Sequence, residues 1–235
     1  MNNWSIVDIF WSYGFAIICI KYLISYYEKI VGPTLILIIL TLLWSIRLGT
    51  HLARRIFSNI HHEDGRYVKL RKQWSKDLNL KMFQFYMLQA LILAFLLTPI
   101  ASSLLHKQKT LNVVHYIGLG LTLTAFIGEL IADHQLNNFK KNVSKNKVCD
   151  IGLWAWTRHP NYFFEWLIWV GFALLSYNTE YYAIPGVICA GLMFYLLTRV
   201  SGIPMTEEHL LSSKGAAYKK YQTEVPAFWP RKPKS

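Results

Sequence analysis

The stretch that decides the fold is PTLILIILTLLWSIRLGT, residues 33–50. It is an almost unbroken apolar run, about as long as a helix needs to be to cross the hydrocarbon core of a bilayer. Gly32 and Pro33 mark its start, because proline suits the first turn of a helix. The run predicts a transmembrane helix.

Comparable runs recur along the chain, in which 53% of the 235 residues are hydrophobic and only 16% are charged. The candidate spans are residues 5–25, 33–50, 82–102, 111–132, 162–177 and 181–200. We therefore predict an all-α, polytopic transmembrane helical bundle of about six spans. It would form a single membrane domain over residues 1–235, with cytosolic loops and a C-terminal amphipathic helix.

The distribution of basic residues predicts the orientation. Lys and Arg number nine in residues 47–81, five in residues 140–158 and seven in residues 199–234, which together are 21 of the 25. With six spans these three regions lie on one side of the membrane. The positive-inside rule makes that side cytosolic, with both termini, in a bacterial inner membrane or an endoplasmic reticulum. The net charge of +12 is then mostly an excess of basic residues that face lipid headgroups on the cytosolic side. Nucleic-acid binding is a poor alternative explanation, because no RNA- or DNA-binding motif accompanies the charge.

The spacing of the cysteines and histidines in the sequence predicts that the chain has no metal site and no disulfide. Cys19, Cys149 and Cys189 lie far apart and form no CxxC pair. His61 and His62 are adjacent, but no HExxH motif or His/Cys cluster accompanies them. The first residues, MNNWSIVDIFW, lack a basic region and a cleavage site, so we interpret them as part of the first span.

Three candidate spans carry polar side chains on one face near the predicted cytosolic side. Glu129, Asp133, Asn137 and Lys140 follow helical spacing at the end of the fourth span, as do Arg47, His51 and Arg54 at the end of the second, and Asn161 and Glu165 at the start of the fifth. Ionisable groups in a bilayer are costly and are usually turned inward and paired. Structural ion pairs would explain any one of them, but three such faces at the same side favour a shared site.

The RHPNY segment, residues 158–162, is the most specific part of this pattern. Pro160 suits the first turn of a helix, which leaves free N–H groups beside Arg158 and His159. A helix N-terminus with an adjacent arginine attracts phosphate, whereas Asn161 and Glu165 suit neutral polar groups. We expect a ligand with both parts, such as a nucleotide. The alternative is an interfacial anchor made with Trp154 and Trp156.

Several motifs together resemble one family. They are EDGRYVKLRKQW (63–74), ADHQLNNFK (132–140), GLWAWTRHPNYFFEWLIWVG (152–171) and a C-terminal segment from VSGIPMTEEHL (200–210) to YKKYQTEVPAFWP (218–230). The chain resembles the DUF1295 membrane proteins, which are related to the C-terminal domain of the steroid 5-alpha-reductases, over about residues 44–235. RHPNY alone is shared with the isoprenylcysteine carboxyl methyltransferases and the sterol C14-reductases.

The resemblance implies an NADPH-dependent reductase of an activated C=C bond in a lipophilic, steroid- or isoprenoid-like substrate reached through the bilayer. The expected cofactor-binding residues are Asp133, Asn137, Lys140, Arg158, His159, Asn161, Tyr162, Glu165, Glu208, His209 and Tyr218. Candidate donors to a conjugated carbonyl are Tyr67, His51 and Arg47. The steroid reductases use a Glu–Tyr pair for that purpose, and the sequence shows no clean counterpart. The alternatives are an S-adenosylmethionine-dependent methyltransferase and a non-catalytic lipid-binding protein.

Overall fold

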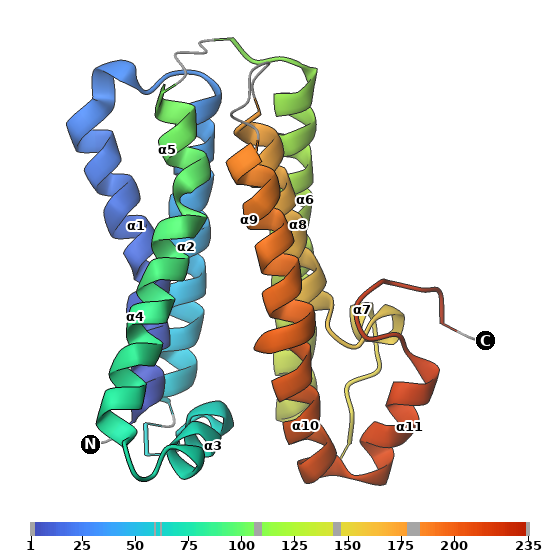
Figure 1. Ribbon diagram of the computed structural model, residues 1–235. Helices are drawn as coiled ribbons and strands as arrows, with labels where there is room; N and C mark the ends of the chain where they lie inside the picture. The colour runs from blue at the N-terminus through green and yellow to red at the C-terminus, as the bar shows by residue number, and fades with distance from the viewer. Residues whose placement is uncertain are drawn as a thin grey trace. The chain divides into compact units, whose positions relative to one another are not determined.

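The computed structural model describes residues 3–58, 60–61, 63–105, 110–142, 147–177 and 184–233 (Figure 1). Every regular element within these residues is a helix, which confirms the expected all-α fold. The chain divides into two compact units. One comprises Met1–His115 with Leu175–Pro185, and the other comprises Tyr116–Leu174 with Gly186–Ser235. Each unit is described by itself, and a single domain stays a prediction.

The first unit is built from three long apolar helical segments (Figure 1). A short helix, η1 (Trp4–Ile6), leads into α1 (Val7–Tyr26), and after η2 (Tyr27–Lys29) the chain returns in α2 (Pro33–Phe57). The third rod is α4 (Leu78–Leu96), continued by α5 (Thr98–Leu105), and α3 (Gly65–Gln73) lies in the connection before it. Phe15 of α1 packs edge-on against Trp44 of α2, with ring centroids 5.1 Å apart.

The second unit contains most of α6 (Val113–Asn142), the short α7 (Leu153–Trp156), and α8 (Pro160–Leu175). It also contains α9 (Ile184–Tyr195), which passes through a π-helical turn, η4 (Leu196–Val200), into α10 (Ile203–Lys214) and then α11 (Ala216–Glu224). Helices α6 and α8 pack closely because Gly171 has no side chain. A Cβ atom there would lie 2.1 Å from Thr122 Oγ1.

Five helical stretches are long and apolar enough to cross a membrane: Trp4–Tyr26, Pro33–Phe57, Leu78–Leu105, Val113–Asn142 and Ile184–Lys214. Helix α8, the fifth predicted span, has 16 residues. At 1.5 Å per residue it is about 24 Å long, which is less than the ~30 Å core of a bilayer. The polytopic membrane fold is confirmed, with five of the six predicted spans reaching the length of a crossing.

The helices extend past the predicted spans where charged residues begin. Helix α2 continues to Phe57 instead of ending near residue 50, and α6 continues to Asn142 instead of residue 132. Charged residues end a hydropathy window without ending a helix. The predicted start of the sixth span, at residue 181, lies outside the described residues.

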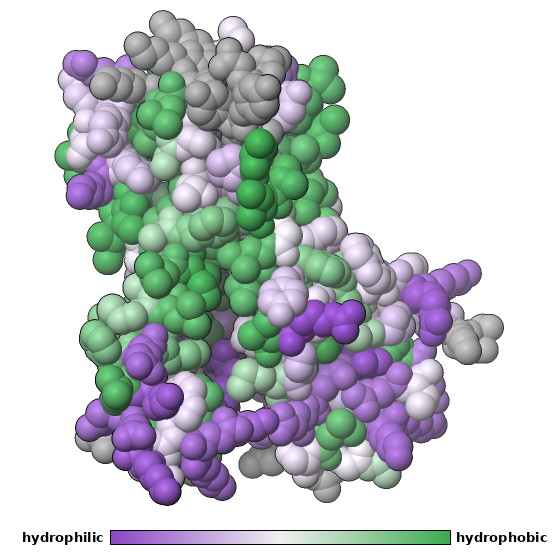
Figure 2. Space-filling model, viewed as in Figure 1, coloured by the Kyte–Doolittle hydropathy of each residue, from purple (hydrophilic) through white to green (hydrophobic). Residues whose placement is uncertain are grey.

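Polar and apolar surfaces separate along the helices. Figure 2 shows hydrophobic residues over the middle of α4 and α9, and hydrophilic residues over α3, α10 and α11. The predicted C-terminal helix is two helices, α10 and α11, which meet at Gly215 with φ 53°. Only glycine adopts this backbone conformation at low cost, so the chain turns there.

Candidate functional site

The approach to the RHPNY segment is fixed by contacts between α6 and α7. Gly152 has φ 58°, and the next residue, Leu153, donates its backbone N–H to Gln135 Oε1 at 2.9 Å. Trp154 Nε1 donates to the carbonyl of Ala132 at 3.0 Å. Pro160 then starts α8, where its missing N–H costs nothing. The segment between α7 and α8 is therefore held against the end of α6.

Arg158 forms hydrogen bonds to several residues of the C-terminal part of the chain. Its Nε atom donates to Glu207 Oε1 at 2.7 Å, and its Nη1 atom donates to the carbonyls of Gln222 at 3.0 Å and Val225 at 2.5 Å. Its backbone N–H donates to the carbonyl of Pro226 at 2.9 Å. The side chain is only 9% exposed. Arg158 thus joins α8, α10 and the segment after α11.

His159 shares the same carboxylate. Its Nε2 atom lies 3.1 Å from Glu207 Oε1, and its ring stacks on Tyr162, with centroids 5.3 Å apart and planes inclined by 10°. The Tyr162 hydroxyl lies 2.9 Å from Thr206 Oγ1 on α10. Burial lowers the pKa of His159 below its usual value, although the Glu207 carboxylate opposes this shift. The neutral ring therefore donates its Nε2–H to Glu207.

Glu207 bonds to three side chains at the centre of this network. Besides Arg158 and His159, Gln222 Nε2 donates to its Oε2 atom at 2.7 Å. Tyr218 lies beside the ion pair, and burial, followed by the Glu207 charge, raises the pKa of its hydroxyl. An incoming phosphate would compete with this carboxylate for Arg158. Binding of phosphate by Arg158 and His159 stays a prediction, and the geometry favours a role in fastening the C-terminal segment.

Asn161 and Glu165, one turn apart on α8, have a different environment. Glu165 is 8% exposed and accepts a hydrogen bond from Trp169 Nε1 at 3.0 Å. The Oδ1 atom of Asn161 is buried, and within the described residues it has no hydrogen-bond partner. Buried acceptors are nearly always satisfied, so this atom is a candidate ligand contact.

The remaining predicted cofactor residues are less enclosed. Asp133 is half-buried on α6, whereas Asn137, Lys140, Glu208 and His209 are exposed. Lys140 and Lys214 both act electrostatically on the Cys149 thiol, whose pKa is raised mainly by burial. The structure therefore brings together four of the predicted cofactor residues: Arg158, His159, Tyr162 and Tyr218. The four exposed residues, Asn137, Lys140, Glu208 and His209, lie at the surface.

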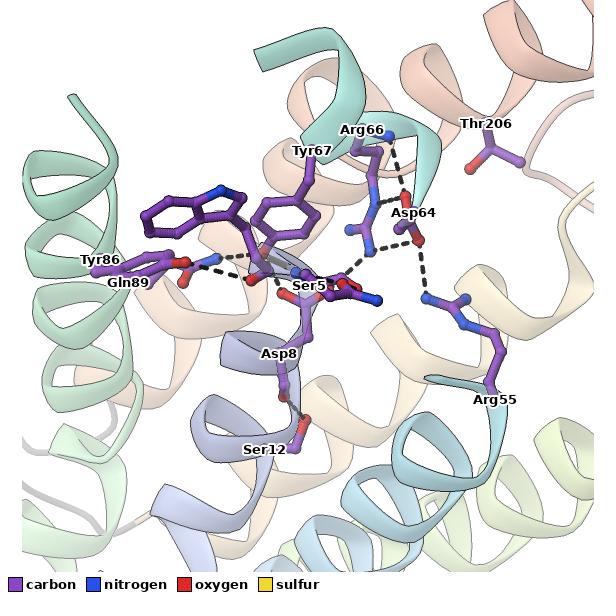
Figure 3. Close-up of polar contacts among 12 residues, drawn as sticks. Ser5, Asp8, Ser12, Arg55, Asp64, Arg66, Tyr67, Tyr86, Gln89 and Thr206 are labelled. Atoms are coloured by element: carbon purple, nitrogen blue, oxygen red, sulfur yellow. Dashed lines mark hydrogen bonds and ion pairs between the residues drawn. The ribbon is translucent and has the colours of Figure 1, made fainter. Parts of the chain in front are cut away.

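A second cluster lies in the first unit, around Asp8 of α1 (Figure 3). Tyr67 donates its hydroxyl to Asp8 Oδ1 at 2.5 Å, and Arg66 Nη2 lies 2.8 Å from Asp8 Oδ2. Arg66 and Arg55 both bond to Asp64, each with a contact of 3.0 Å. Burial, and then the Asp8 charge, raises the pKa of Tyr67 well above its usual range. Tyr67 therefore keeps its proton across the physiological range.

The carboxylates that Tyr67 and Arg158 contact, Asp8 and Glu207, are not among the predicted site residues. Asp8 forms a carboxyl–phenol pair with Tyr67, and its signal in the sequence is an acidic residue inside the first apolar run. The sequence pointed to Glu208 instead of Glu207. Glu207 lies four residues after the buried Ile203 and three before Leu210, a spacing that points it inward.

The other predicted catalytic residues, Arg47 and His51, lie half-buried one turn apart on α2. They and Tyr67 belong to the first unit, whereas the predicted cofactor residues belong to the second. No group of three His, Cys, Asp or Glu side chains able to hold a metal occurs among the residues that the structure describes. His62 lies outside them.

Comparison with known proteins identifies the family. The family described as "Protein of unknown function (DUF1295)" matches residues 1–225. The chain belongs to the DUF1295 family. The match includes the first unit's N-terminal helices, which precede the motifs recognised from residue 44 onward.

One relative of this DUF1295 chain is an uncharacterized protein of Schizosaccharomyces pombe. It is 28% identical over 220 residues, with 84% of this chain and 63% of that protein covered. The chain therefore spans less than two thirds of the length of this curated relative. No solved structure matches the chain.

Proposed function

We propose that this DUF1295 protein is a membrane-embedded reductase that uses NADPH to reduce an activated C=C bond in a lipophilic substrate. The observation that carries the proposal is the buried Asn161 Oδ1 atom, which lacks a partner within the described residues. A carboxamide N–H, such as that of nicotinamide, suits this acceptor. The RHPNY motif that contains Asn161 is shared with the sterol C14-reductases and also with the isoprenylcysteine carboxyl methyltransferases, so it supports a cofactor site there without choosing between the two.

Glu165 supports a cofactor site beside Asn161. Its carboxyl group is buried one turn further along the same face of α8. It would accept a second N–H or a ribose hydroxyl, while Trp169 holds one of its oxygens in place. NADPH, when bound, supplies the hydride for the β carbon. The residues of the chain orient the cofactor and exclude water.

Tyr67 is the best of the three candidate donors to the substrate carbonyl. Its raised pKa keeps it protonated, so it stabilises a developing enolate as a hydrogen-bond donor. In the resting structure that proton is donated to Asp8. The phenol would exchange Asp8 for the substrate carbonyl, while Arg66 continues to neutralise the Asp8 carboxylate. The proton that completes the reduction at the α carbon comes from solvent.

The surroundings support a lipophilic substrate. The helices that reach the length of a crossing expose large apolar side chains, among them Phe10, Leu91, Ile127 and Val187. Such surface lies against lipid tails, from which a substrate can enter sideways. We place both termini and the basic regions on the cytosolic side, where NADPH is available.

A second candidate is an S-adenosylmethionine-dependent methyltransferase, and one observation favours it. Arg158 and His159 are bonded to Glu207, which reduces the positive charge left for cofactor phosphates. S-adenosylmethionine carries no phosphate, and its amines also suit Asn161 and Glu165. A protein that binds neither cofactor would instead be a lipid-binding protein.

Equilibrium binding to the purified chain in detergent tests these functions. We expect NADPH to bind, and the double variant Asn161→Ala with Glu165→Gln to weaken binding by at least tenfold while the protein still folds. Asn79→Ala, at an exposed asparagine of α4, is the matched control and should not change the affinity. Binding of S-adenosylmethionine without NADPH would refute the reductase, and binding of neither would refute both enzymes.

A further inference from the structure

The segment after α11, residues 225–231, runs back beside α7 and the start of α8 (Figure 1). Its backbone is bonded there near both ends. The N–H of Arg158 donates to the carbonyl of Pro226 at 2.9 Å, and the N–H of Arg231 donates to the carbonyl of Trp156 at 2.9 Å. The position of this segment on the second unit is therefore fixed by main-chain contacts.

Two aromatic residues of the segment pack against the membrane helices. Phe228 is buried, whereas Trp229 is 56% exposed. The centroid of the Trp229 ring lies 5.3 Å from that of Trp166 on α8 and 6.1 Å from that of Phe194 on α9. Trp229 therefore covers two apolar helices while more than half of its own surface stays open.

The two helices agree on the depth at which Trp229 lies. Phe194 is five residues before Arg199, the first charged residue after the start of α9. Trp166 is six residues after Pro160, with which α8 begins. At 1.5 Å per residue, both contacts lie about 7–9 Å inward of the polar ends of these helices. This is the depth of an aromatic belt, at the boundary between lipid headgroups and acyl chains.

Basic residues follow Trp229 directly. Arg231 and Lys232 are exposed, and residues 225–233 contain no acidic side chain. The acid that precedes this segment, Glu224, is in an ion pair with Lys220 at 3.8 Å. Long basic side chains two and three positions after an interfacial tryptophan reach the headgroup layer beside it. The segment therefore combines an apolar ring with positive charges that no acid of its own balances.

We propose that Trp229, Arg231 and Lys232 form a C-terminal anchor that binds anionic phospholipid headgroups of the cytosolic leaflet. The indole ring lies between headgroups and acyl chains, and the two cations contact lipid phosphates. A zwitterionic lipid suits the anchor less well, because its ammonium group repels them. The same segment is bonded to Arg158, so the lipid contact also helps to hold the RHPNY segment in place. The anchor does not depend on the proposed reductase, because a chain that binds no NADPH would still contain it.

Spin labelling of the full-length chain in vesicles of phosphatidylcholine and phosphatidylglycerol tests the depth. A nitroxide on Trp229→Cys is compared for its collisions with oxygen, which dissolves in lipid, and with a water-soluble nickel complex. Ile188→Cys, on an exposed position of α9, is the lipid reference, and Lys220→Cys, on α11, is the water reference. The original chain, whose three cysteines are buried, gives the background labelling.

We expect the label at Trp229 to resemble the lipid reference more than the water reference. Pro230→Cys offers a second exposed label position if thermal unfolding shows that Trp229→Cys does not fold. A label as accessible to nickel as the one at Lys220 would overturn the proposal, because the surface would then lie in water and be open to a soluble partner.

Native mass spectrometry of the chain in detergent, with equal amounts of the same two lipids, tests the choice of headgroup. We expect adducts of phosphatidylglycerol to predominate, and Arg231→Gln with Lys232→Gln to weaken its binding about fivefold for each residue removed. Lys72→Gln with Lys76→Gln, at exposed lysines of the first unit, makes the same charge change and should have little effect. Equal losses in the two double variants, or equal binding of the two lipids by the original chain, would overturn the anionic-lipid contact.

Discussion

Glu207 of α10 and Arg158, three residues before Asn161, form an ion pair with 2.7 Å between Oε1 and Nε. Their side chains are 14% and 9% exposed, so the pair is largely removed from water. It joins the start of α8 to a helix 49 residues further along the chain. The most specific motif of the sequence therefore serves first to assemble the C-terminal part around itself.

Loss of the Glu207 charge should destabilise this assembly. Glu207→Gln leaves Arg158 in a largely buried place without its carboxylate, and we expect a loss of about 3 kcal/mol in the free energy of unfolding. The measurement is thermal or denaturant unfolding in detergent. Glu208→Gln changes the same charge at an exposed neighbour and should alter stability by less than about 0.5 kcal/mol. Equal effects of the two substitutions would contradict the role of the pair.

Stability should also depend on pH through His159. Because burial lowers its pKa in the folded chain, the unfolded chain takes up a proton at higher pH, near 6.5. The two states bind equally few protons above about pH 7.5, and stability then falls as pH drops through about 6.5 toward the folded pKa. Unfolding temperatures between about pH 7.5 and 5.5 measure this slope.

His159→Gln should flatten that slope, because glutamine does not titrate. His209→Gln is the matched control, since His209 is exposed on α10 and should leave the slope unchanged. A slope that persists in His159→Gln would assign the pH dependence to another group.

The fold was largely predictable because hydropathy is a strong local signal. Apolar runs such as residues 33–50 identify the spans, because an apolar run of about 18 residues or more seldom occurs outside a membrane helix. The ends of α2 and α6 were not predictable from hydropathy. Arginine and lysine are good helix formers, so Arg54 and Lys140 end the apolar run without ending the helix. The division into α10 and α11 depended on a single glycine, Gly215, whose positive φ is a property of the folded chain.

The site was less predictable, because its contacts join residues distant in sequence. Asp8 and Tyr67 are separated by 59 positions, and nothing local to either residue indicates the pair. The partners of Arg158 include the backbone carbonyls of Gln222 and Val225, and hydrogen bonds to backbone carbonyls cannot be predicted from a motif of side chains. By contrast, Asn161 and Glu165 lie one turn apart on one helix, and their shared face followed from spacing alone.

The turn before α7 offers a test of backbone geometry. Gly152 has φ 58°, and a Cβ atom there would lie 2.3 Å from Gln135 Nε2. Gly152→Ala should therefore cost about 1–3 kcal/mol of stability, through strain and displacement of the Gln135 side chain. Gly191→Ala is the matched control, because a Cβ atom at Gly191 meets nothing within 4 Å. Similar unfolding temperatures for the two variants would show that the turn tolerates a side chain.

Tyr67→Phe separates chemistry from cofactor binding in the proposed reductase. The substitution removes the hydroxyl that would bond to the substrate carbonyl but leaves the ring that packs near Phe85, with centroids 6.1 Å apart. Removing one donor to a developing oxyanion typically lowers kcat by about 10²–10³. We expect a loss of that size in NADPH oxidation with a lipophilic enone, and no change in the Kd for NADPH. Tyr195→Phe, at an exposed tyrosine of α9, should change neither quantity. Full activity in Tyr67→Phe would move the role of donor to His51 or Arg47, and a weakened Kd would contradict the expected separation of chemistry from cofactor binding.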